Sequence, residues 1–513
     1  MFILWNRIMQ NTVIQRYVCS LPSYEAALQA LHGLQSNAEY LNLATQNNCN
    51  DSCKITDTRK YLLRTGITLE KLDTLSVIHV AGTKGKGSAC AYTEAILREH
   101  GYNTGFFSSP HLISVRERIK INGQSLSQLL FAEYFWKVYE KLESTKEHES
   151  DMPMYFKFLT ILMFNIFLDL NVDVAIIEVG IGGLKDSTNI VRNPVCVGIS
   201  SLAMDHTSLL GNTLEDIAYQ KSGIFKPKTI AFSVPQLPLA MHVLEKRSVE
   251  ENCTLHIIPP FEEYTWENLS PILKIRNHVQ KQNASLAIQM ATTWIMVEGN
   301  KSPSVVYNTV QTNKVSYIYN NYVQQTNLSK IVSMDKIAMG LASCNWPGRM
   351  QILRSSIADF YLDGAHTTES IESCISWFND VTNRRRGKKS LIFNVTGNRD
   401  STKLMIPLKS LHFENAYFVP NYAGVESIDD AFNRFRMDEQ KLKCLKNSEF
   451  WGAGSVIANS VSEVLREIKK DTSKHQVTCN NDEKHQVLVT GSLHLVGAVL
   501  AVLDPDLTMN TQF

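Results

Sequence analysis

The chain has 513 residues, of which 44% are hydrophobic and 20% are charged, a composition typical of globular proteins. Its length favours two or three domains rather than one. Lys and Arg total 51 against 50 for Asp and Glu, so no global basic field exists to attract nucleic acid or an anionic membrane. We therefore expect no nucleic-acid partner, and any anionic ligand must be held by a local site.

Two further features restrict the class of protein. The most apolar long stretch, residues 158–170, is interrupted by Asn165 and Asp169 and falls short of the roughly 20 residues that a membrane span needs. The ten cysteines are scattered, and several lie inside apolar segments, which is typical of small core residues in a reducing compartment. The sequence therefore predicts a protein that does not span a membrane.

The N-terminal segment, residues 1–23, has two interpretations. It carries Arg7 and Arg16, and the first acidic residue of the chain is Glu25. This weakly amphipathic pattern resembles a mitochondrial leader. The alternative is a disordered tail with Met9 as a second start. Both stay open, so we expect the protein in the mitochondrion, in the matrix or associated with the inner membrane, and in the cytoplasm.

Helix-like and strand-like segments alternate along the next part of the chain. Residues 24–43 have apolar side chains at helical spacing, and the polar residues 44–58 indicate a loop. The segments that follow are an expected strand 76–81, a helix 88–100, and strands 172–179, 195–199 and 229–234. Continuous apolar runs of this kind predict a parallel sheet covered on both faces. We therefore predict a doubly wound α/β domain over residues 24–344, whose ligands bind where strands end and helices begin.

A second, smaller alternation of strands and helices follows residues 346–348 (WPG), which interrupt the regular secondary structure. It consists of expected strands 359–362, 390–395 and 487–489 and an expected helix 368–378. We predict a second α/β domain over residues 345–513, with a disordered loop at 469–484. The polar residues 299–333 indicate a surface insertion within the first domain.

The glycine-rich segment from Gly82 to Ser88 (GTKGKGS) lies directly between an expected strand and an expected helix. In that position backbone N–H groups and a helix N-terminus converge on an anion. The glycines let the backbone approach a phosphate, Lys86 supplies a positive charge, and Ser88 can reach a metal ion. The segment departs from the general P-loop expression because Gly87 separates Lys86 from Ser88. We interpret it as an ATP phosphate loop.

This variant loop resembles the nucleotide loop of the Mur ligase superfamily, and further blocks narrow the resemblance to the folylpolyglutamate synthase branch. The blocks are TGFFSSPHL (104–112), VRERIKING (115–123), YFKFLT (155–160), VDVAIIEVGIGG (172–183), SSLAMDHTSLLG (200–211), KSGIFK (221–226), WPGRMQ (346–351), YLDGAHT (361–367) and VLVTGSLHLVG (487–497). An ordered set of this length is far more specific than any one motif. LQSNAEYL (34–41) resembles the eukaryotic members. Departures include Ala89, where Thr is common, and Ala203, where Gly is common.

The resemblance implies both a fold and an activity. The implied fold is α/β, with a Mur-ligase-like P-loop ATPase domain around a parallel-rich sheet and a smaller Rossmann-like C-terminal domain that brings in the amino acid. The implied enzyme is an ATP- and Mg²⁺-dependent ligase that joins L-glutamate to the γ-carboxylate of reduced folates and their polyglutamates. It works through an acyl phosphate, releases ADP and phosphate, and supports one-carbon metabolism. We expect a monomer.

The resemblance also implies roles for individual residues. The implied Mg²⁺ ligands are Ser109, Glu178 and His206, the catalytic residues are Lys86, Lys221 and His366, and the nucleotide contacts are Gly85, Lys86, Gly87, Ser88, Arg349 and Asp363. Glu178 closes an expected buried strand, where a carboxylate emerges at the sheet edge that binds ligands. Lys221 matches a lysine that relatives carry as a carbamate, an adduct with carbon dioxide. The alternative is an ordinary phosphate-binding lysine.

Two other features each keep a simpler alternative. Tyr155 and Phe156 suit the flat apolar slot that a pterin ring needs, although aromatic residues at helical spacing are more often core residues. The basic run at residues 384–389 would attract a polyglutamate tail, although a charge run is usually a solvated loop. Both alternatives stay open for each feature.

Three other functions compete with the implied one. A bifunctional dihydrofolate synthase would use the same ATP chemistry on dihydropteroate, and the shared motifs do not exclude it. A catalytically silent nucleotide-binding relative would have lost Glu178, His206 or Lys221, and all three are present. A P-loop GTPase fits poorly because the loop expression differs and the sequence has no convincing NKxD motif.

Overall fold

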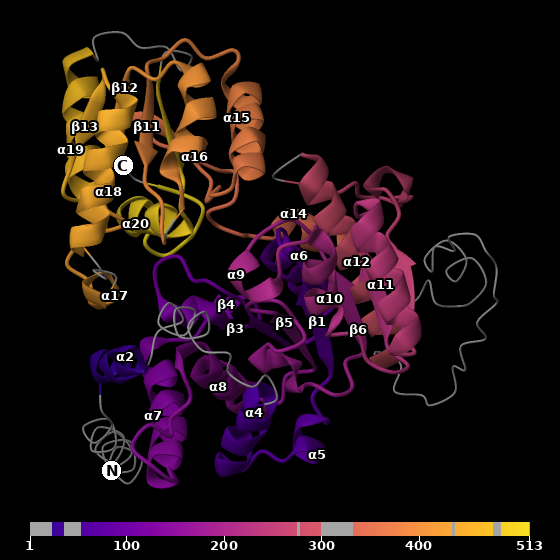
Figure 1. Ribbon diagram of the computed structural model, residues 1–513. Coiled ribbons are helices and arrows are strands. Elements are labelled where there is room, and N and C mark those ends of the chain that lie inside the picture. Colours follow the sequence, from indigo (N-terminus) through magenta and orange to yellow (C-terminus); the bar gives the residue numbers. More distant parts are fainter. Residues whose placement is uncertain are drawn as a thin grey trace, which may run out of the picture. The chain divides into compact units, whose positions relative to one another are not determined.

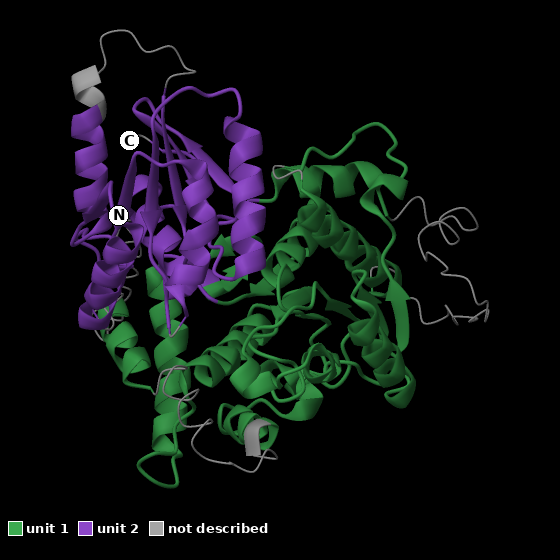
Figure 2. Cartoon of the chain, turned by 45° about the horizontal axis from the view of Figure 1, so that its top comes forward, with its two compact units in different colours: residues 1–109, 118–344 green, residues 110–117, 345–513 purple. Residues whose placement is uncertain are grey.

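The computed structural model describes residues 23–34, 53–273, 277–298, 332–397, 399–432, 437–475, 484–511 and 513. The chain forms two compact units, which Figure 2 colours separately. Unit 1 comprises residues 1–109 and 118–344, and unit 2 comprises residues 110–117 and 345–513. Residues 110–117 lie inside the expected first domain along the sequence, yet they pack with unit 2. The expected leader, up to residue 22, and the expected insertion, up to residue 331, lie outside the described residues.

Unit 1 is built around an eight-stranded sheet of order β4-β3-β2-β5-β1-β6-β7-β8 (Figure 1). The strands are β1 (Val77–Ala81), β2 (Thr104–Phe107), β3 (Ile119–Ile121), β4 (Gln124–Ser125), β5 (Val174–Glu178), β6 (Cys196–Ile199), β7 (Ile230–Ser233) and β8 (Thr254–Ile257). Neighbouring strands are parallel except in the pairs β2–β3 and β3–β4. Strands β1, β5 and β6 are buried along their whole length, which explains why each is a continuous apolar run.

Helices cover both faces of this sheet. The described helices of unit 1 are α2 (Tyr24–Gly33), α4 (Cys53–Arg64), α5 (Leu69–Leu72), α6 (Lys86–Glu99), α7 (Gln128–Ser144), α8 (Tyr155–Asp169), α9 (Thr207–Leu210), α10 (Leu214–Ser222), α11 (Pro238–Glu250), α12 (His278–Glu298) and α14 (Met334–Ser343). In β6, Gly198 abuts Met290 of α12, whereas Val197 and Ile199 share a core with α10 and α11. Because successive strand residues alternate between faces, both faces are closed and the strand ends are where polar groups gather.

Unit 2 contains a six-stranded sheet of order β13-β12-β11-β14-β10-β9, which is parallel except for β9. The strands are β9 (Gln351–Arg354), β10 (Ala358–Leu362), β11 (Lys389–Phe393), β12 (Asn415–Phe418), β13 (Ser455–Ile457) and β14 (His485–Thr490). The helices are α15 (Thr368–Thr382), α16 (Ser401–Leu408), α17 (Ile428–Phe432), α18 (Met437–Trp451), α19 (Val461–His475) and α20 (Leu493–Leu503). One core includes α19 and α20, and the other includes α15, α16 and α18.

The apolar stretch at residues 158–170 forms most of helix α8. Its side chains from Phe158 to Phe164 are fully buried in unit 1, which accounts for their apolar character. Among the described residues, no helix combines the length and the apolar character needed to cross a membrane.

Two segments that the sequence indicates as loops are partly helical. Helix α4 begins at Cys53, inside the expected loop 44–58. Helix α19 continues to His475, inside the expected loop 469–484, and residues 476–483 lie outside the described residues. The buried face of α19 has helical spacing and consists of Val461, Val464, Leu465 and Ile468. Lys469 and Lys470, which follow, lie on the exposed side of this amphipathic helix, so their polarity marks a helix face rather than a loop.

Candidate active site

Four parallel strands bring polar segments together at one edge of the unit 1 sheet. Strands β2, β5, β1 and β6 are neighbours in that order. Ser109 follows β2, Glu178 ends β5, the loop from Gly82 to Gly85 follows β1, and Ser200 follows β6. Because these strands point in the same direction, the four segments converge on the edge where a doubly wound sheet binds its ligands.

Two glycines allow the loop after β1 to approach its neighbours closely. Gly82 has a φ of +145°, and a Cβ atom there would lie 1.9 Å from Ser200 Oγ. Gly85 has a φ of +92°, and a Cβ atom there would lie 2.3 Å from Asn283 Oδ1 of α12. The backbone N–H of Thr83 donates to the Ser201 carbonyl at 2.9 Å. Only glycine fits the two close positions, so the loop is confined between the end of β6 and α12.

Helix α6 begins immediately after this loop. Gly85 is its N-cap residue, and no side chain caps the helix. The first N–H groups of a helix have no partner within the helix, and the helix dipole favours negative charge beside them. The N–H groups of Lys86, Gly87 and Ser88 therefore form an anion-binding N-terminus. The structure places the four expected nucleotide residues from Gly85 to Ser88 at this terminus.

Lys86, Ser109 and Glu178 lie together at the same edge. Lys86 Nζ lies 3.8 Å from Glu178 Oε1, and the backbone N–H of Ser109 donates to Glu178 Oε2 at 3.0 Å. The Glu178 side chain is only 5% exposed. A carboxylate this buried needs an opposite charge or hydrogen-bond donors to remain ionised. Both kinds of partner are present, and they hold the Glu178 carboxylate beside the N-terminus of α6.

The same carboxylate suits a magnesium ion. Proteins usually hold Mg²⁺ with one or two carboxylates, together with water and substrate phosphates. Glu178 and the adjacent Ser109 supply a carboxylate and a hydroxyl oxygen of this kind. Within the described ranges, no three His, Cys, Asp or Glu side chains gather at metal-binding spacing. Glu178 and Ser109 therefore fit a cation that is also held by nucleotide phosphates.

Lys221 lies at the end of α10 and is buried beneath the phosphate loop. Its Nζ donates to the Gly82 carbonyl at 2.6 Å, and the residue is 3% exposed. Burial lowers the pKa of Lys221 to about 7, and the positive charge of Lys86 acts in the same direction. Asp205 and Asp186 oppose this shift. Near pH 7, Lys221 is therefore a neutral amine in a large fraction of the protein molecules, whereas an exposed lysine is almost always protonated.

His206 is the N-cap residue of helix α9 and has a left-handed backbone conformation, with a φ of +51°. This conformation is uncommon for a residue other than glycine. The backbone N–H of His206 donates to Asp205 Oδ1 at 2.9 Å, and its imidazole Nε2 lies 3.9 Å from Asp205 Oδ2. Asp205 also influences the pKa of Lys221. His206 thus lies next to a carboxylate of the same polar edge, and its role as a metal ligand stays a prediction.

In unit 2, Asp363 directly follows β10 and organises the surrounding backbone. Its Oδ2 accepts the Met350 N–H at 2.9 Å, and its Oδ1 accepts the Ala365 N–H at 2.9 Å. Burial raises the pKa of the Asp363 carboxyl, whereas the neighbouring Arg349 guanidinium lowers it. A Cβ atom at Gly364 would lie 2.9 Å from Arg349 Nη1. Asp363 and Arg349, both expected from the sequence, are therefore close together in this unit.

His366 lies just beyond these two residues, before α15. Its Nδ1 lies 2.9 Å from the Gly364 carbonyl. Its backbone N–H donates to Ser370 Oγ at 3.1 Å. Ser492 is the N-cap residue of α20 and accepts the His494 N–H at 3.1 Å. The observed contact of Ser492 is thus a helix cap.

Three residues of the polar edge in unit 1 are not among the site residues expected from the sequence. Asn283 contacts the phosphate loop from α12, and Asp186 and Asp205 act on Lys221 electrostatically. Asp186 is also the N-cap residue of the 3-10 helix η2 (Ser187–Ile190). The local sequence GLKDST contains this capping signal, because an Asp that precedes a helical turn commonly accepts its N–H groups. The position of Asn283 has no comparable local signal.

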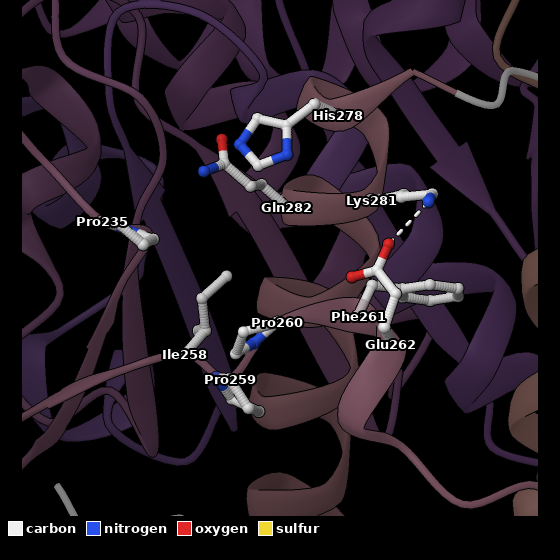
Figure 3. Close-up of a pocket in the computed structure, with 9 residues that line it drawn as sticks. All are labelled: Pro235, Ile258, Pro259, Pro260, Phe261, Glu262, His278, Lys281 and Gln282. Atoms are coloured by element: carbon white, nitrogen blue, oxygen red, sulfur yellow. Dashed lines mark hydrogen bonds and ion pairs between the residues drawn. The ribbon is translucent and has the colours of Figure 1, made fainter.

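A small pocket lies beside the first turns of α12. It is lined by Pro235, Ile258, Pro259, Pro260, Phe261, Glu262, His278, Lys281 and Gln282 (Figure 3). The lining is mainly apolar on the side of the proline-rich segment, and a 2.6 Å ion pair between Lys281 and Glu262 lies at its margin. Gln282 immediately precedes Asn283, the residue that abuts Gly85. The pocket and the phosphate loop are therefore adjacent along α12.

The most informative similarities are with whole proteins. The mitochondrial folylpolyglutamate synthases of Bos taurus and Homo sapiens are each 37% identical to this chain, over 94% of it and over 93% and 92% of their own lengths. A putative folylpolyglutamate synthase of Caenorhabditis elegans is 38% identical over 94% of this chain and 92% of its own. No family model matches the chain.

Solved structures share the fold. The Mycobacterium tuberculosis folylpolyglutamate synthase complexed with ADP matches with a TM-score of 0.68 at 20% identity, over 93% of this chain and 98% of its own. The apo form of the L. casei enzyme matches with a TM-score of 0.67 at 21% identity, over 94% and 99%. These matches confirm the expected Mur-ligase-like α/β fold.

The fold and the phosphate-loop geometry define a two-unit α/β protein with an anion-binding helix N-terminus at the edge of its larger sheet. Within this class, the extent of the sequence matches shows that the chain belongs to the folylpolyglutamate synthases, which use ATP to add glutamate to folates. A P-loop GTPase is thereby excluded, and the expected ATP-dependent addition of glutamate to folates is confirmed.

The contacts of Glu178 lead to a first prediction. We expect Glu178→Gln to fold like the wild type, because glutamine keeps the side-chain volume and an acceptor for the Ser109 N–H. Glutamate ligation should fall by roughly 100-fold or more, because a charge at the transferring phosphate is lost. The measurement is the rate of ATP- and glutamate-dependent folate elongation, with circular dichroism as the check on folding.

Glu94→Gln is the matched control for this prediction. Glu94 is 4% exposed in the same unit, but its carboxylate contacts Arg98 and Thr104 at the opposite end of β2. We expect this variant to lose stability while keeping its ligation rate. A wild-type rate in folded Glu178→Gln would contradict the assignment of Glu178 to the site.

Proposed function

We propose that unit 1 transfers the γ-phosphoryl group of ATP to the γ-carboxylate of a reduced folate, and that the amine of L-glutamate attacks the resulting acyl phosphate. The observation that carries this proposal is the uncapped N-terminus of α6 with Lys86 and Glu178 beside it. A carboxylate and an amine do not condense in water at useful rates, so the carboxylate must first be activated. Catalysis of phosphoryl transfer consists mainly of positioning and charge stabilisation, which this edge provides.

The residues of the edge divide this work. The N–H groups at Gly85 to Ser88 bind phosphate oxygens, and the Lys86 ammonium stabilises negative charge on the phosphoryl group. A magnesium ion held by Ser109, Glu178 and His206 would neutralise charge on the nucleotide phosphates and orient the transferring group. Glu178 orients the Lys86 ammonium through their 3.8 Å ion pair.

The pocket beside α12 is our candidate for the site that binds the adenine ring of ATP. Its apolar wall of Ile258, Pro259 and Pro260 suits a flat heteroaromatic ring, and Gln282 supplies a polar group at its margin (Figure 3). A nucleotide with its phosphates at Gly85 would extend along α12, because Asn283 abuts Gly85 and Gln282 lines the pocket.

For unit 2, we propose Arg349 and Asp363 as nucleotide contacts and His366 as a contact of the incoming glutamate. A guanidinium is suited to phosphate oxygens, and the buried Asp363 holds the loop that carries Arg349 through the Met350 N–H. The Nδ1 of His366 lies 2.9 Å from the Gly364 carbonyl, which fixes the imidazole in the loop that also carries Asp363. We also propose that the enzyme works as a monomer.

The order of bond changes can be tested with oxygen isotopes. In the proposed route an oxygen of the folate γ-carboxylate attacks the γ-phosphorus, ADP leaves, and the glutamate nitrogen then displaces phosphate from the acyl carbon. If the γ-carboxylate carries heavy oxygen, we expect one labelled atom in inorganic phosphate for each amide formed, measured by mass spectrometry. Label in AMP, or unlabelled phosphate, would show that activation follows another route.

We further propose that Lys221 carries a carbamate. Its neutral amine, favoured by a pKa of about 7, would attack the carbon of carbon dioxide, forming an N–C bond and releasing one proton to water. The product is an anion in place of an amine that is partly neutral and partly protonated near pH 7. The carbamate nitrogen keeps one N–H, which can still donate to the Gly82 carbonyl. The lowered pKa supports this proposal over an ordinary phosphate-binding lysine.

The carbamate has a predictable pH dependence. Only the neutral amine adds carbon dioxide, so at constant carbon dioxide pressure the ¹³C carbamate signal should rise between about pH 6 and 8, on either side of the pKa of about 7. Lys221→Ala should lose ligation and recover part of it with short carboxylic acids, which replace the missing anion. Recovery with chloride alone would argue against a carbamate, as would a signal that is unchanged in Lys221→Ala.

For localisation, we propose both mitochondrion and cytoplasm. The curated relatives from cattle and human carry the description mitochondrial in their names, and residues 1–24 have the leader-like composition with Arg7 and Arg16. We expect a reporter fused to residues 1–24 to enter mitochondria, and a version that begins at Met9 to enter poorly because it lacks Arg7. Fluorescence imaging distinguishes these results, and a uniform cytosolic signal from both fusions would reject the leader.

A further inference from the structure

A chain of hydrogen bonds runs from the middle of β1 to the segment that follows β5. His79 of β1 is fully buried, and its Nε2 lies 2.8 Å from Thr188 Oγ1. Thr188, also fully buried, donates its hydroxyl proton to Asp186 Oδ1 at 2.6 Å. The three side chains lie in sequence segments far apart, so the contact is made only by the fold.

The direction of this chain follows from proton counting. A threonine hydroxyl has a single proton, and Thr188 gives it to the Asp186 carboxylate, so His79 must donate to Thr188 from Nε2. Burial, aided by the charge of Lys226, lowers the pKa of His79 to about 3, which makes its imidazole neutral with one proton. That proton is therefore on Nε2, and the buried Nδ1 has no hydrogen-bond partner.

Asp186 uses this support to hold a tight turn. Its Oδ2 accepts the Ile181 N–H at 3.0 Å, and its Oδ1 accepts the Thr188 N–H at 3.0 Å. A Cβ atom at Gly180 would lie 3.0 Å from Asp186 Oδ2, so the carboxylate lies directly against the chain just beyond Glu178. The orientation of Asp186 therefore determines how the chain leaves β5.

The same segment is fixed to the end of α10. The Leu184 N–H donates to the Gln220 carbonyl at 2.7 Å, and Asn189 Nδ2 donates to the Gly223 carbonyl at 3.0 Å. A Cβ atom at Gly183 would lie 2.7 Å from the Lys221 carbonyl. Residues 180–190 thus form a direct link between Glu178 and Lys221, and Asp186 is the anchor inside this link.

A histidine is an unfavourable choice for this position unless its hydrogen bond matters. The neighbouring strand residues Ile78 and Val80 are apolar and fully buried. His79 buries an Nδ1 atom that has no hydrogen-bond partner, which costs free energy of folding, and an apolar side chain at this position would avoid that cost. We propose that His79 is a positioning residue for ligation, which through Thr188 and Asp186 fixes the link between Glu178 and Lys221. This inference rests on the roles proposed above for Glu178 and Lys221.

The test compares two substitutions of His79 in the full-length enzyme. His79→Gln keeps a donor at the place of Nε2, whereas His79→Leu removes it. We expect His79→Leu to lower kcat for folate elongation by about 10- to 100-fold, because small displacements of catalytic groups have effects of this size. The KM for ATP should change less than twofold, because the phosphate loop keeps its own contacts. His79→Gln should restore most of the kcat.

His485→Leu in unit 2 is the matched control. His485 is likewise buried on a central strand, and its Nε2 lies 2.8 Å from Ser390 Oγ. We expect this variant to lose thermal stability but to keep its kcat within about twofold. If His79→Leu keeps the wild-type kcat, or if His79→Gln is as impaired as His79→Leu at equal thermal stability, the positioning role is wrong.

A second variant covers a folding failure of His79→Leu. Thr188→Val has nearly the same shape as wild type and interrupts the same hydrogen-bond chain. We expect a similar fall in kcat, and, where His79→Leu folds, the double variant His79→Leu with Thr188→Val should be no worse than Thr188→Val alone, because both residues act through Asp186. Independent, additive effects would overturn the proposal.

The Glu178→Gln variant separates the positioning role of His79 from the proposed site itself. If Glu178→Gln stays active, the proposed site is wrong. If Glu178→Gln is inactive and Thr188→Val is fully active, only the positioning role is wrong.

Discussion

The hydrogen bond from Lys221 Nζ to the Gly82 carbonyl is the contact on which the site of unit 1 depends. It joins the end of α10 to the loop that follows β1, and so fixes two segments that come from different crossovers of the sheet. The burial that accompanies this bond also shifts the pKa of Lys221. The contact therefore holds the first residue of the phosphate loop, and the burial that goes with it lowers the positive charge of the lysine beneath the loop.

The two units use a buried carboxylate at a strand end in the same way. Glu178 ends β5 and accepts the Ser109 N–H, and Asp363 follows β10 and accepts the N–H groups of Met350 and Ala365. Each carboxylate also has a cation beside it, Lys86 in unit 1 and Arg349 in unit 2. A carboxylate in this position organises loops from neighbouring strands, because strand ends are where backbone N–H groups lose their sheet partners.

Much of the fold follows from local sequence, and the site follows only in part. The strands around Val77–Ala81 and Val174–Glu178 are predictable because full burial requires unbroken apolar runs. The Gly82–Ser88 loop is predictable because its glycines and lysine are adjacent in sequence. Asn283 is not, since its contact with Gly85 is created by the packing of α12. His79 is hidden for a similar reason: inside an apolar strand, its sequence context gives no sign of Thr188.

The segment at residues 110–117 has a consequence for how the chain is made. Leu112 packs against Gly348 and Gly497, and a Cβ atom at Gly497 would lie 2.0 Å from the Leu112 carbonyl oxygen. Leu112 leaves the ribosome long before either glycine is synthesised. Unit 2 therefore cannot be completed as its own stretch of polypeptide emerges, and it must recruit a segment supplied by the earlier part of the chain. A fragment beginning at Asn345 would lack that segment, so a single cut in the polypeptide cannot separate the two units.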